Sequence, residues 1–507
     1  MSVHSRFPDP RAAGQMGGPG RLPDPAAAGQ TPGLHGRLAF VMVGGAVVGL
    51  MYAVLPDGHS AFQTWVATLV AVALPWAYLL HQHGGRVPLR TDSLVLGGFT
   101  LTHLLPPLYL SLREGARYVD LYEVSALQPR VALITGAAAM LMLASFNAIF
   151  RRLGGGNQVV PRPSRPVPPE RAIPVIAVVA VVIVSARLYM LASGGYYWTY
   201  SDESFVFGRW YSVTSLLSRY GLFIPVILWI LGGDDRRWRM WAWVATAAEI
   251  AWVLPSGSRQ PLLEAAAGFL LVAWWRRRKL PSARILVLLL VATFTMPILG
   301  EYRNTISRYT GNREVSLDAT TRALWEARDR VGLNGSLDLA DQFIDRMYDG
   351  QFLAYLIKHY RELYDWEYGA TYTERLPYVF VPYFVGGERP IMQVPLDRWF
   401  KLLRRGSNPS TLLGEGYANF GYAGIAIIAM VLGGVLALYE RAFRSLRENV
   451  FIDVIYLVHA SMLPYLVSAS LAHWLAFLRN ALIMMVLMLV FTRMVLAVRV
   501  RQTGVLT

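Results

Sequence analysis

The chain of 507 residues is 54% hydrophobic and only 16% charged, with a mean hydropathy of +0.36. A soluble domain carries about a quarter charged residues, so this composition excludes an ordinary soluble enzyme. The net charge of +15 does not indicate a nucleic-acid-binding protein, because the cations fall in short loops between apolar runs rather than on one basic face. Cysteine is absent, which excludes disulfides and thiolate metal sites.

Repeated apolar runs dominate the rest of the sequence. Each is roughly 18 to 20 residues long, which is enough to cross a bilayer as a helix. We therefore predict an all-α polytopic integral membrane protein with about twelve transmembrane helices. The predicted spans are 38–55, 61–80, 94–111, 131–150, 172–192, 213–232, 239–254, 261–275, 283–299, 412–438, 452–470 and 474–497.

These spans divide the chain into five parts. The segment 1–36 is rich in Pro, Gly and Ala and is expected to be a disordered cytoplasmic tail. An N-terminal bundle of about nine spans follows at 37–299, and about three spans make up 412–497. Between them lies one large loop, 300–411, and the chain ends in a short tail, 498–507.

Positive charges predict the orientation of the spans, because loops rich in Arg and Lys stay on the cytoplasmic side. The arginine-rich loops are 81–93, 151–171, 233–238, 276–282 and 439–451. We therefore expect both termini in the cytoplasm, and a location in the cell membrane (inner or plasma membrane). The large loop then lies on the extracytoplasmic side.

The loop 300–411 is too polar to cross a membrane, yet it has helical periodicity. Apolar residues such as Phe352 and Leu356 recur at helical spacing, opposite Asp345 and Asp349. We predict amphipathic helices there, lying on the membrane surface. On this pattern Asp349 belongs to the solvated face.

Arginines at the extracytoplasmic ends of apolar runs predict an anion-binding site. They are Arg187, Arg219, Arg259, Arg303 and Arg479, and Arg389 in the large loop is added to them. A charge at bilayer depth is costly unless it is paired or hydrated, and a planar guanidinium binds phosphate through two parallel hydrogen bonds. One such arginine alone is best explained by snorkelling to lipid headgroups. Five at one level favour a shared site for an anionic ligand.

Glu415 and His473 are the candidate general bases. Glu415 lies in the sequence PSTLLGEGYANFGYAG at 409–424, at the mouth of the span 412–438. Polar groups at the edge of hydrocarbon are expensive and usually functional, and the flanking glycines let a ligand or another helix approach. His473 begins the last span. A lone histidine is more often held by its neighbours than catalytic.

Nucleotide and metal motifs are missing from the sequence. It contains no Walker loop, no nucleotide-binding glycine fingerprint and no HExxH sequence. The large loop has no DxD pair, and the pair His81 and His83 is too weak a pattern for a metal site. We therefore expect no cofactor and a metal-independent site.

Three short motifs carry a family resemblance: SGSRQPLLE at 256–264, GEGYANFGYAG at 414–424 and FLRN at 477–480. They resemble motifs of the O-antigen polymerase (Wzy-type) or oligosaccharide repeat unit polymerase family. The GExYxNFG segment is the specific one, and the Ser-Gly-Ser-Arg turn also occurs in the related O-antigen ligases. The resemblance implies a helical bundle of the GT-C kind, with Arg259 and Arg479 on the pyrophosphate of a polyprenyl-linked sugar. It also implies that Glu415, Tyr417 and Asn419 border the reaction site.

The activity that the resemblance implies is that of a membrane glycosyltransferase. Such an enzyme polymerises oligosaccharide repeat units, carried on undecaprenyl pyrophosphate, into a surface polysaccharide. The expected partners are this lipid-linked oligosaccharide, membrane lipid and other proteins of a polysaccharide assembly system, but no nucleic acid. Two alternatives remain open. One is a ligase that moves the glycan to a different acceptor, and the other is a transporter or flippase that makes no bond.

Overall fold

The computed structural model describes the larger part of the chain. The described residues are 44–45, 48, 61–110, 124–155, 167–192, 214, 217–232, 235–254, 259–277, 282–285, 287, 298–299, 301–302, 305, 321–329, 344, 348–381, 394 and 410–503. The predicted tail 1–36 lies outside them, as does the greater part of the predicted spans 38–55 and 283–299. Within the described residues every regular element is a helix.

Six of the described helical segments are long and apolar enough to cross a membrane. They comprise α2 (Ala61–Gln82), α6 (Gln128–Arg152), α7 (Pro169–Ala192), α16 (Leu412–Leu446), α17 (Val450–Met462) with its continuation η8 (Leu463–Ser468), and α18 (Leu471–Thr503). The prediction of an all-helical fold is confirmed for the described residues, which contain six apolar helices of sufficient length to span a membrane. A shorter apolar helix contains η5 (Tyr220–Leu222) and α9 (Phe223–Leu231).

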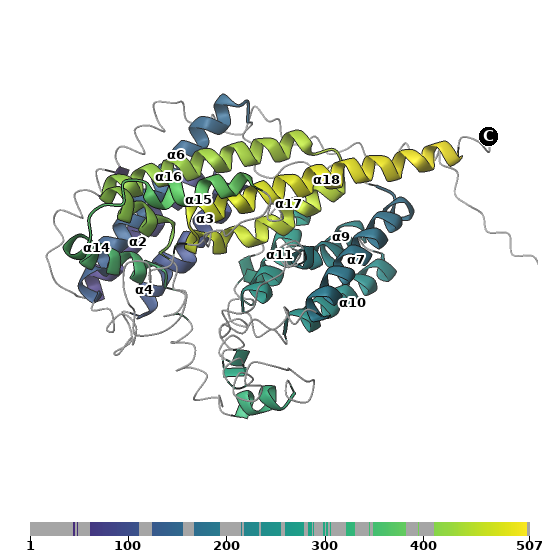
Figure 1. Cartoon of the computed structure of the whole chain (residues 1–507), viewed down its shortest axis with the longest axis horizontal. Coiled ribbons are helices and arrows are strands. Elements are labelled where there is room, and N and C mark those ends of the chain that lie inside the picture. Colours follow the sequence, from purple (N-terminus) through teal and green to yellow (C-terminus); the bar gives the residue numbers. More distant parts are fainter. Residues whose placement is uncertain are drawn as a thin grey trace, which may run out of the picture.

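Small residues allow the long helices to pack closely. A Cβ added at Gly136 of α6 would lie 2.7 Å from Cα of Ala71 in α2. On the other side of α6, a Cβ at Gly433 of α16 would overlap the carbonyl oxygen of Met142. Small residues at such crossings are typical of membrane helices, where packing rather than water drives association. Figure 1 shows α16 and α18 running along the long axis of the molecule.

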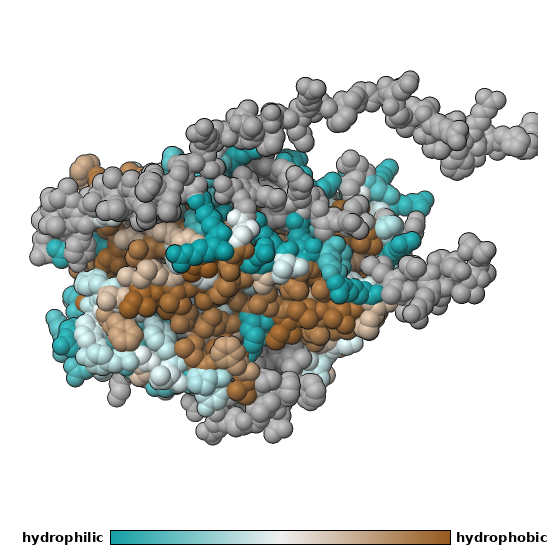
Figure 2. Space-filling view, turned by 90° about the horizontal axis from the view of Figure 1, so that it is seen from above, coloured by the Kyte–Doolittle hydropathy of each residue, from teal (hydrophilic) through white to brown (hydrophobic). Residues whose placement is uncertain are grey.

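The surface of the described part has an apolar middle. Figure 2 shows hydrophobic residues as a continuous expanse across the centre of one face, with hydrophilic residues towards its left and right ends. Several large apolar side chains of α7 and α18 are exposed, among them Val181 at 64% and Leu487 at 56%. Exposed apolar side chains of this kind suit contact with lipid.

The helices α10 (Arg236–Val253) and α11 (Arg259–Arg277) follow α9 and form a hairpin. Their bounds agree with the predicted runs 239–254 and 261–275. Asp235 caps α10, because its carboxylate accepts a hydrogen bond from the backbone N–H of Arg237 at 2.8 Å. Figure 1 shows α7, α9 and α10 together on one side of the molecule, with α11 between them and the long helices.

The predicted span 94–111 contains a wide turn. It consists of α3 (Thr91–Phe99), the π-helical turn η3 (Thr100–Leu104) and α4 (Leu105–Leu110). A π-helical turn holds one extra residue, so it rotates the helix that follows it, and such turns are frequent at functional sites. The turn brings Thr102 to Asp349, the residue just before α14 (Gly350–Leu363).

The described part of the large loop consists mainly of α14 and α15 (Ala370–Phe380). Phe352 and Leu356, which belong to the predicted apolar face, are buried in α14. The prediction that Asp349 lies on a solvated face is wrong. Its side chain is buried, because the turn before α14 inserts between η3 and η8.

The predicted span 412–438 is not one straight helix. At Phe420 and Gly421 the backbone leaves the helical region, with φ and ψ of 60° and −145° at Gly421. A Cβ at Gly416 would lie 2.8 Å from the carbonyl oxygen of Gly424. In an unbroken helix eight residues rise by about 12 Å, so the short first part of α16 folds back onto the long second part.

Ion pairs gather where the C-terminal half of α16 meets α3 and α17. Arg90 binds both carboxylate oxygens of Asp92, at 3.1 and 2.5 Å, and the two side chains are almost fully buried. Nearby, Glu440 accepts a hydrogen bond from Arg444 at 3.2 Å and another from the hydroxyl of Tyr456 at 2.9 Å. We call these residues the ion-pair end of α16.

Candidate functional site

Glu415 is fully buried in the short first part of α16. Its Oε2 accepts a hydrogen bond of 2.8 Å from the backbone N–H of Leu471, the first residue of α18. The first N–H groups of a helix have no partner within the helix, and a carboxylate there also interacts favourably with the helix dipole. The carboxylate therefore caps α18, which gives it a structural role that the sequence did not reveal.

Asn419 fastens the start of α15 to the first part of α16. Its Nδ2 donates to the hydroxyl of Thr371 at 2.7 Å and to the carbonyl oxygen of Glu415 at 2.8 Å. Its Oδ1 accepts from the backbone N–H of Gly369 at 2.9 Å. The adjacent Tyr372 is hydrogen-bonded to Asn419, and burial together with the nearby Glu415 carboxylate raises the pKa of its hydroxyl.

Tyr417 belongs to an aromatic cluster beside these residues. Its ring meets those of Trp366 and Tyr422 edge to face, with both pairs of ring centroids 5.4 Å apart. The side chain is 5% exposed, and its hydroxyl is 3.5 Å from the carbonyl oxygen of Ile357. Its position at the border of the site is set by ring packing rather than by a strong polar contact.

His473 lies near the beginning of α18, within electrostatic range of Arg219. His473 follows Leu471 by two residues and is half-buried. Arg219 directly precedes η5, is exposed, and lies near enough for its charge to act on the His473 imidazole. The structure thus brings the two candidate bases, Glu415 and His473, to one helix terminus together with one of the predicted arginines.

Arg187 is held in an ion pair. Its Nη2 is 2.7 Å from both carboxylate oxygens of Glu249 in α10 and donates to the carbonyl oxygen of Ser218 at 3.2 Å. The guanidinium also lies over the ring of Trp252, 4.8 Å from its centroid. A Cβ at Gly221 would overlap both members of the pair. Arg187 therefore contacts Ser218, the residue before Arg219, but the carboxylate of Glu249 already balances its charge.

Arg479 lies farther along α18 than His473. Six residues separate them, which corresponds to about 9 Å of helix rise. Its guanidinium donates to Oδ1 of Asn480 at 2.7 Å and to the carbonyl oxygen of Val379 in α15. Arg479 thereby connects α18 to α15.

For the remaining predicted arginines the structure describes no side-chain contacts. Arg303 and Arg389 lie outside the described residues, and Arg259 is described only as the first residue of α11. Among the residues that the structure describes, no group of three His, Asp or Glu side chains is arranged to hold a metal ion.

Asp349 is a buried carboxyl group that the sequence interpretation missed. Its Oδ2 accepts from the hydroxyl of Ser468, and its backbone N–H donates to the carbonyl oxygen of Thr102 at 2.9 Å. Burial raises the pKa of Asp349 to about 7, against the lowering effect of hydrogen bonds from Ser468 and Thr102. Its helical spacing matched a solvated face, so no sequence signal distinguished it.

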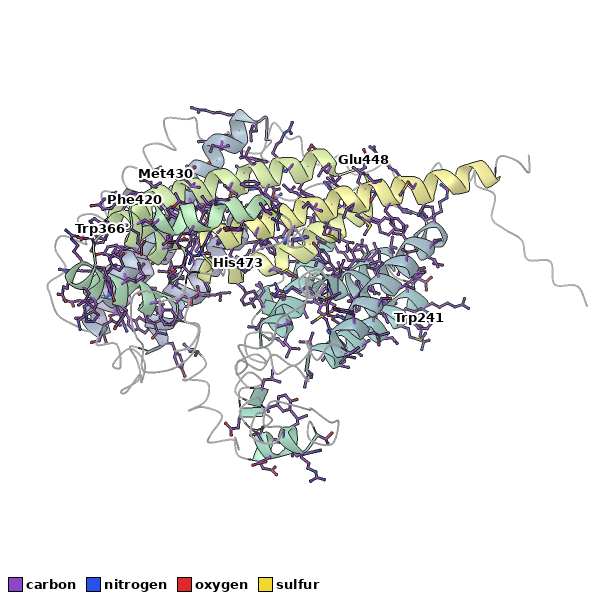
Figure 3. All side chains as sticks on the ribbon, viewed as in Figure 1. Trp241, Trp366, Phe420, Met430, Glu448 and His473 are labelled. Carbon is purple, nitrogen blue, oxygen red and sulfur yellow. The ribbon has the colours of Figure 1, made fainter. Side chains whose placement is uncertain are left out.

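Two carboxyl groups therefore hold the connection between α17 and α18. Asp349 binds the connection at Ser468, and Glu415 binds it three residues later at Leu471. The preceding part of this connection is packed tightly as well, because a Cβ at Gly98 of α3 would overlap the carbonyl oxygen of Pro464. The result is a rigid turn that carries His473. Figure 3 shows His473 near the beginning of α18.

Comparisons with known proteins supply no identification: no family model matches the chain, and neither does a curated protein or a solved structure.

Proposed function

We propose that this chain is a membrane glycosyltransferase that polymerises polyprenyl-pyrophosphate-linked oligosaccharide repeat units. The observation that supports it best is that Glu415 binds the backbone at the start of α18, two residues before His473, and that Arg219 lies within electrostatic range of His473. A carboxylate, an imidazole and a guanidinium are the groups that such a transfer uses, and they come from three distant segments of the sequence.

The proposed reaction forms one glycosidic bond and breaks one bond to phosphate. A hydroxyl oxygen of the acceptor glycan attacks the anomeric carbon of the donor, whose bond to the pyrophosphate oxygen breaks. Polyprenyl pyrophosphate leaves with the bonding electron pair. Glu415 or His473 takes the hydroxyl proton, and Arg219 and Arg479 stabilise the negative charge on the departing pyrophosphate. The bilayer holds both lipid-linked substrates in one plane and so supplies proximity.

The proposal includes a topology. About twelve spans, with both termini in the cytoplasm of a cell-membrane protein, place the start of α18 on the extracytoplasmic side. The Arg-rich loops at the ion-pair end of α16 support this orientation, and so does the large loop at its other end. The proposed site then faces the side on which surface polysaccharide is assembled.

Two variants of Glu415 test the proposal with the full chain in lipid nanodiscs. The substrate is the lipid-linked oligosaccharide recovered from cells in which the gene for this protein has been deleted. Glu415→Gln keeps an oxygen for the N–H of Leu471 but loses the base, so we expect at least a hundredfold slower chain lengthening at unchanged stability. Glu415→Ala loses both roles. Glu448→Gln, at the exposed connection after α16, is the control. Full activity of Glu415→Gln would reduce Glu415 to a helix cap.

The same assay separates the alternatives. Transfer of the glycan to an acceptor that carries no polyprenyl lipid would identify a ligase. The break in α16 at Phe420 and Gly421 favours the third candidate, a transporter, because interrupted helices often line transport sites. Movement of the lipid-linked glycan across sealed vesicles, with no new glycosidic bond, would identify it.

A further inference from the structure

The connection between α14 and α15 presents a tyrosine on a strained backbone. Tyr368 has a φ of 45°, in the left-handed region that non-glycine residues rarely adopt, and Gly369 follows with a φ of 93°. Yet the Tyr368 side chain is 73% exposed. Strain of this kind persists only where the surroundings impose it, and it gathers at functional sites.

Backbone hydrogen bonds to the first part of α16 impose this conformation. The N–H of Glu367 donates to the carbonyl oxygen of Ala418 at 3.0 Å, and the N–H of Tyr368 donates to that of Asn419 at 3.2 Å. Oδ1 of Asn419 accepts from Gly369, as described above. The candidate site and the strained turn are therefore one rigid unit, joined through Asn419.

Other aromatic residues flank Tyr368 in the turn or lie on the first part of α16, to which the turn is hydrogen-bonded. We define the aromatic platform by five residues that are exposed or half-buried: Tyr364, Trp366, Tyr368, Phe420 and Tyr422. They are linked beneath by packed rings: Tyr360 stacks on Trp366 at 5.9 Å and lies 5.6 Å from Tyr364, and Tyr417 contacts Trp366 and Tyr422. Figure 3 shows Trp366 and Phe420 at the same end of the molecule.

The charged residues around the platform distinguish between a lipid surface and a glycan as its ligand. The segment 361–368 carries three carboxylates, Glu362, Asp365 and Glu367, against one guanidinium, Arg361. Asp365 is 94% exposed. Surfaces that settle into lipid headgroups are enriched in Lys and Arg, since the headgroups are anionic. An acidic rim disfavours that partner. It suits a neutral glycan, whose C–H groups stack on ring faces and whose hydroxyls donate to carboxylates.

We propose that the aromatic platform binds sugar residues of a neutral glycan and holds the acceptor chain beside Asn419 and Glu415. That the bound glycan is the acceptor rests on the proposed function, whereas the binding of a glycan does not. Because ring contacts hold Tyr364, Trp366 and Tyr422, these side chains lose little conformational entropy on binding.

The first experiment asks whether the platform lies in water. The sequence has no cysteine, so Tyr368→Cys supplies a single thiol for a polarity-sensitive fluorophore. The full chain is reconstituted in vesicles of phosphatidylcholine and phosphatidylglycerol. We expect water-like emission from this label, and lipid-like emission from the matched Leu487→Cys, whose side chain is 56% exposed on α18. Lipid-like emission from position 368 would overturn the proposal.

The second experiment measures binding directly. Saturation-transfer NMR on the full chain in nanodiscs uses a panel of cello-, malto- and mannotetraose. Tyr368→Gly removes the ring and relieves the positive φ, so the variant is expected to fold at least as well as the wild type. We expect its affinity to fall about tenfold, with Tyr368→Phe close to wild type. No saturation transfer to any sugar, or equal transfer in Tyr368→Gly, would overturn the proposal.

Chain lengthening of the lipid-linked glycan separates this inference from the proposed function. An unchanged KM for the acceptor in an active Tyr368→Gly variant would refute the platform and leave the transferase intact. A wild-type chain that binds glycan through Tyr368 but transfers nothing would refute the transferase and leave the platform as a binding surface. A raised KM with unchanged kcat is the expected result, because Tyr368 contacts none of the reacting groups.

Discussion

The two ends of α16 hold buried charge in different ways. At the ion-pair end, each carboxylate meets a guanidinium, as in Arg90 with Asp92 and in Glu440 with Arg444. The pairs are tied further by uncharged donors, among them Tyr456. Removing one partner of a buried pair is strongly destabilising, because it leaves the other charge buried without it.

At the other end, buried carboxyl groups are held by uncharged donors. Glu415 accepts from the amide of Leu471, and Asp349 accepts from the hydroxyl of Ser468. Hydroxyls and amides orient a carboxyl group without fixing its charge, and Asp349 has its pKa raised to about 7 as a result of burial. The comparison shows that guanidinium groups hold the buried carboxylates at one end of the helix, whereas a backbone N–H binds Glu415 and a hydroxyl binds Asp349 at the other.

Breaking an ion pair should have the largest effect on stability. Asp92→Ala leaves Arg90 buried without this carboxylate, and we expect it to lower the free energy of unfolding by about 3–5 kcal/mol. Titration with sodium dodecyl sulfate in mixed micelles, followed by helix content, measures it. Glu448→Ala is the control, because its pair with Arg493 is solvent-exposed and should contribute far less. Equal losses in the two variants would contradict the comparison.

The protonation of Asp349 should appear as a pH dependence of stability. Its pKa is about 7 in the folded chain and near 3.8 when solvated, so between these values the folded state holds a proton that the unfolded state has lost. Stability is therefore greatest below about pH 4 and falls as pH rises towards 7, by at most about 1.4 kcal/mol per pH unit.

Asp349→Asn should remove this slope, since an amide does not ionise. Unfolding titrations between pH 4 and 8 would compare it with Asp365→Asn, which changes an exposed carboxylate and should keep the wild-type slope. A slope that survives in Asp349→Asn would show that another group carries it.

Close backbone contact at the fold of α16 should tolerate no side chain. Gly424→Ala would place a methyl group against the carbonyl oxygen of Gly416, and we expect a loss of about 1–3 kcal/mol. Gly97→Ala is the matched control in α3, where a Cβ would meet open space and alanine favours the helix. Similar melting temperatures for the two variants would mean that α16 does not fold back as described.

Hydroxyl deletions should also distinguish the two ends of α16. Tyr456→Phe removes a bond of 2.9 Å to the buried Glu440 carboxylate, for which we expect a loss of about 1.5–3 kcal/mol. Tyr417→Phe removes a contact of 3.5 Å and should cost less than about 0.5 kcal/mol. A larger loss from Tyr417→Phe, seen in the same unfolding titrations, would reverse this ranking.

The long apolar runs could be predicted from the sequence because hydrophobic length alone determines them. The fold of α16 at Gly421 could not, since glycine is common in straight membrane helices. The sequence indicated Glu415 and His473 as candidate bases, but not what brings Glu415 to the start of α18. Glu415 is held there by a hydrogen bond from Leu471, 56 residues away, which no local pattern records.

Interactions between distant helices explain the remaining differences. Arg187 was predicted in a shared anion site, but the structure pairs it with Glu249, a residue of α10 with no sequence link to α7. Asp349 followed helical spacing and was assigned to a solvated face, although the turn before α14 buries it. Charge and spacing describe one helix at a time, whereas burial depends on its neighbours.

The π-helical turn η3 lets one continuous helix contact two different partners. Before it, the backbone N–H of Thr91 faces Glu440 at 3.4 Å, and within it the carbonyl oxygen of Thr102 accepts from the backbone N–H of Asp349. Removing one residue from η3 would restore a regular helix and rotate everything beyond it by about 100°. Such a deletion would leave α3 anchored on α16 but would turn Thr102 away from the carboxyl group of Asp349. The extra residue of η3 therefore sets the rotation of this part of the helical bundle.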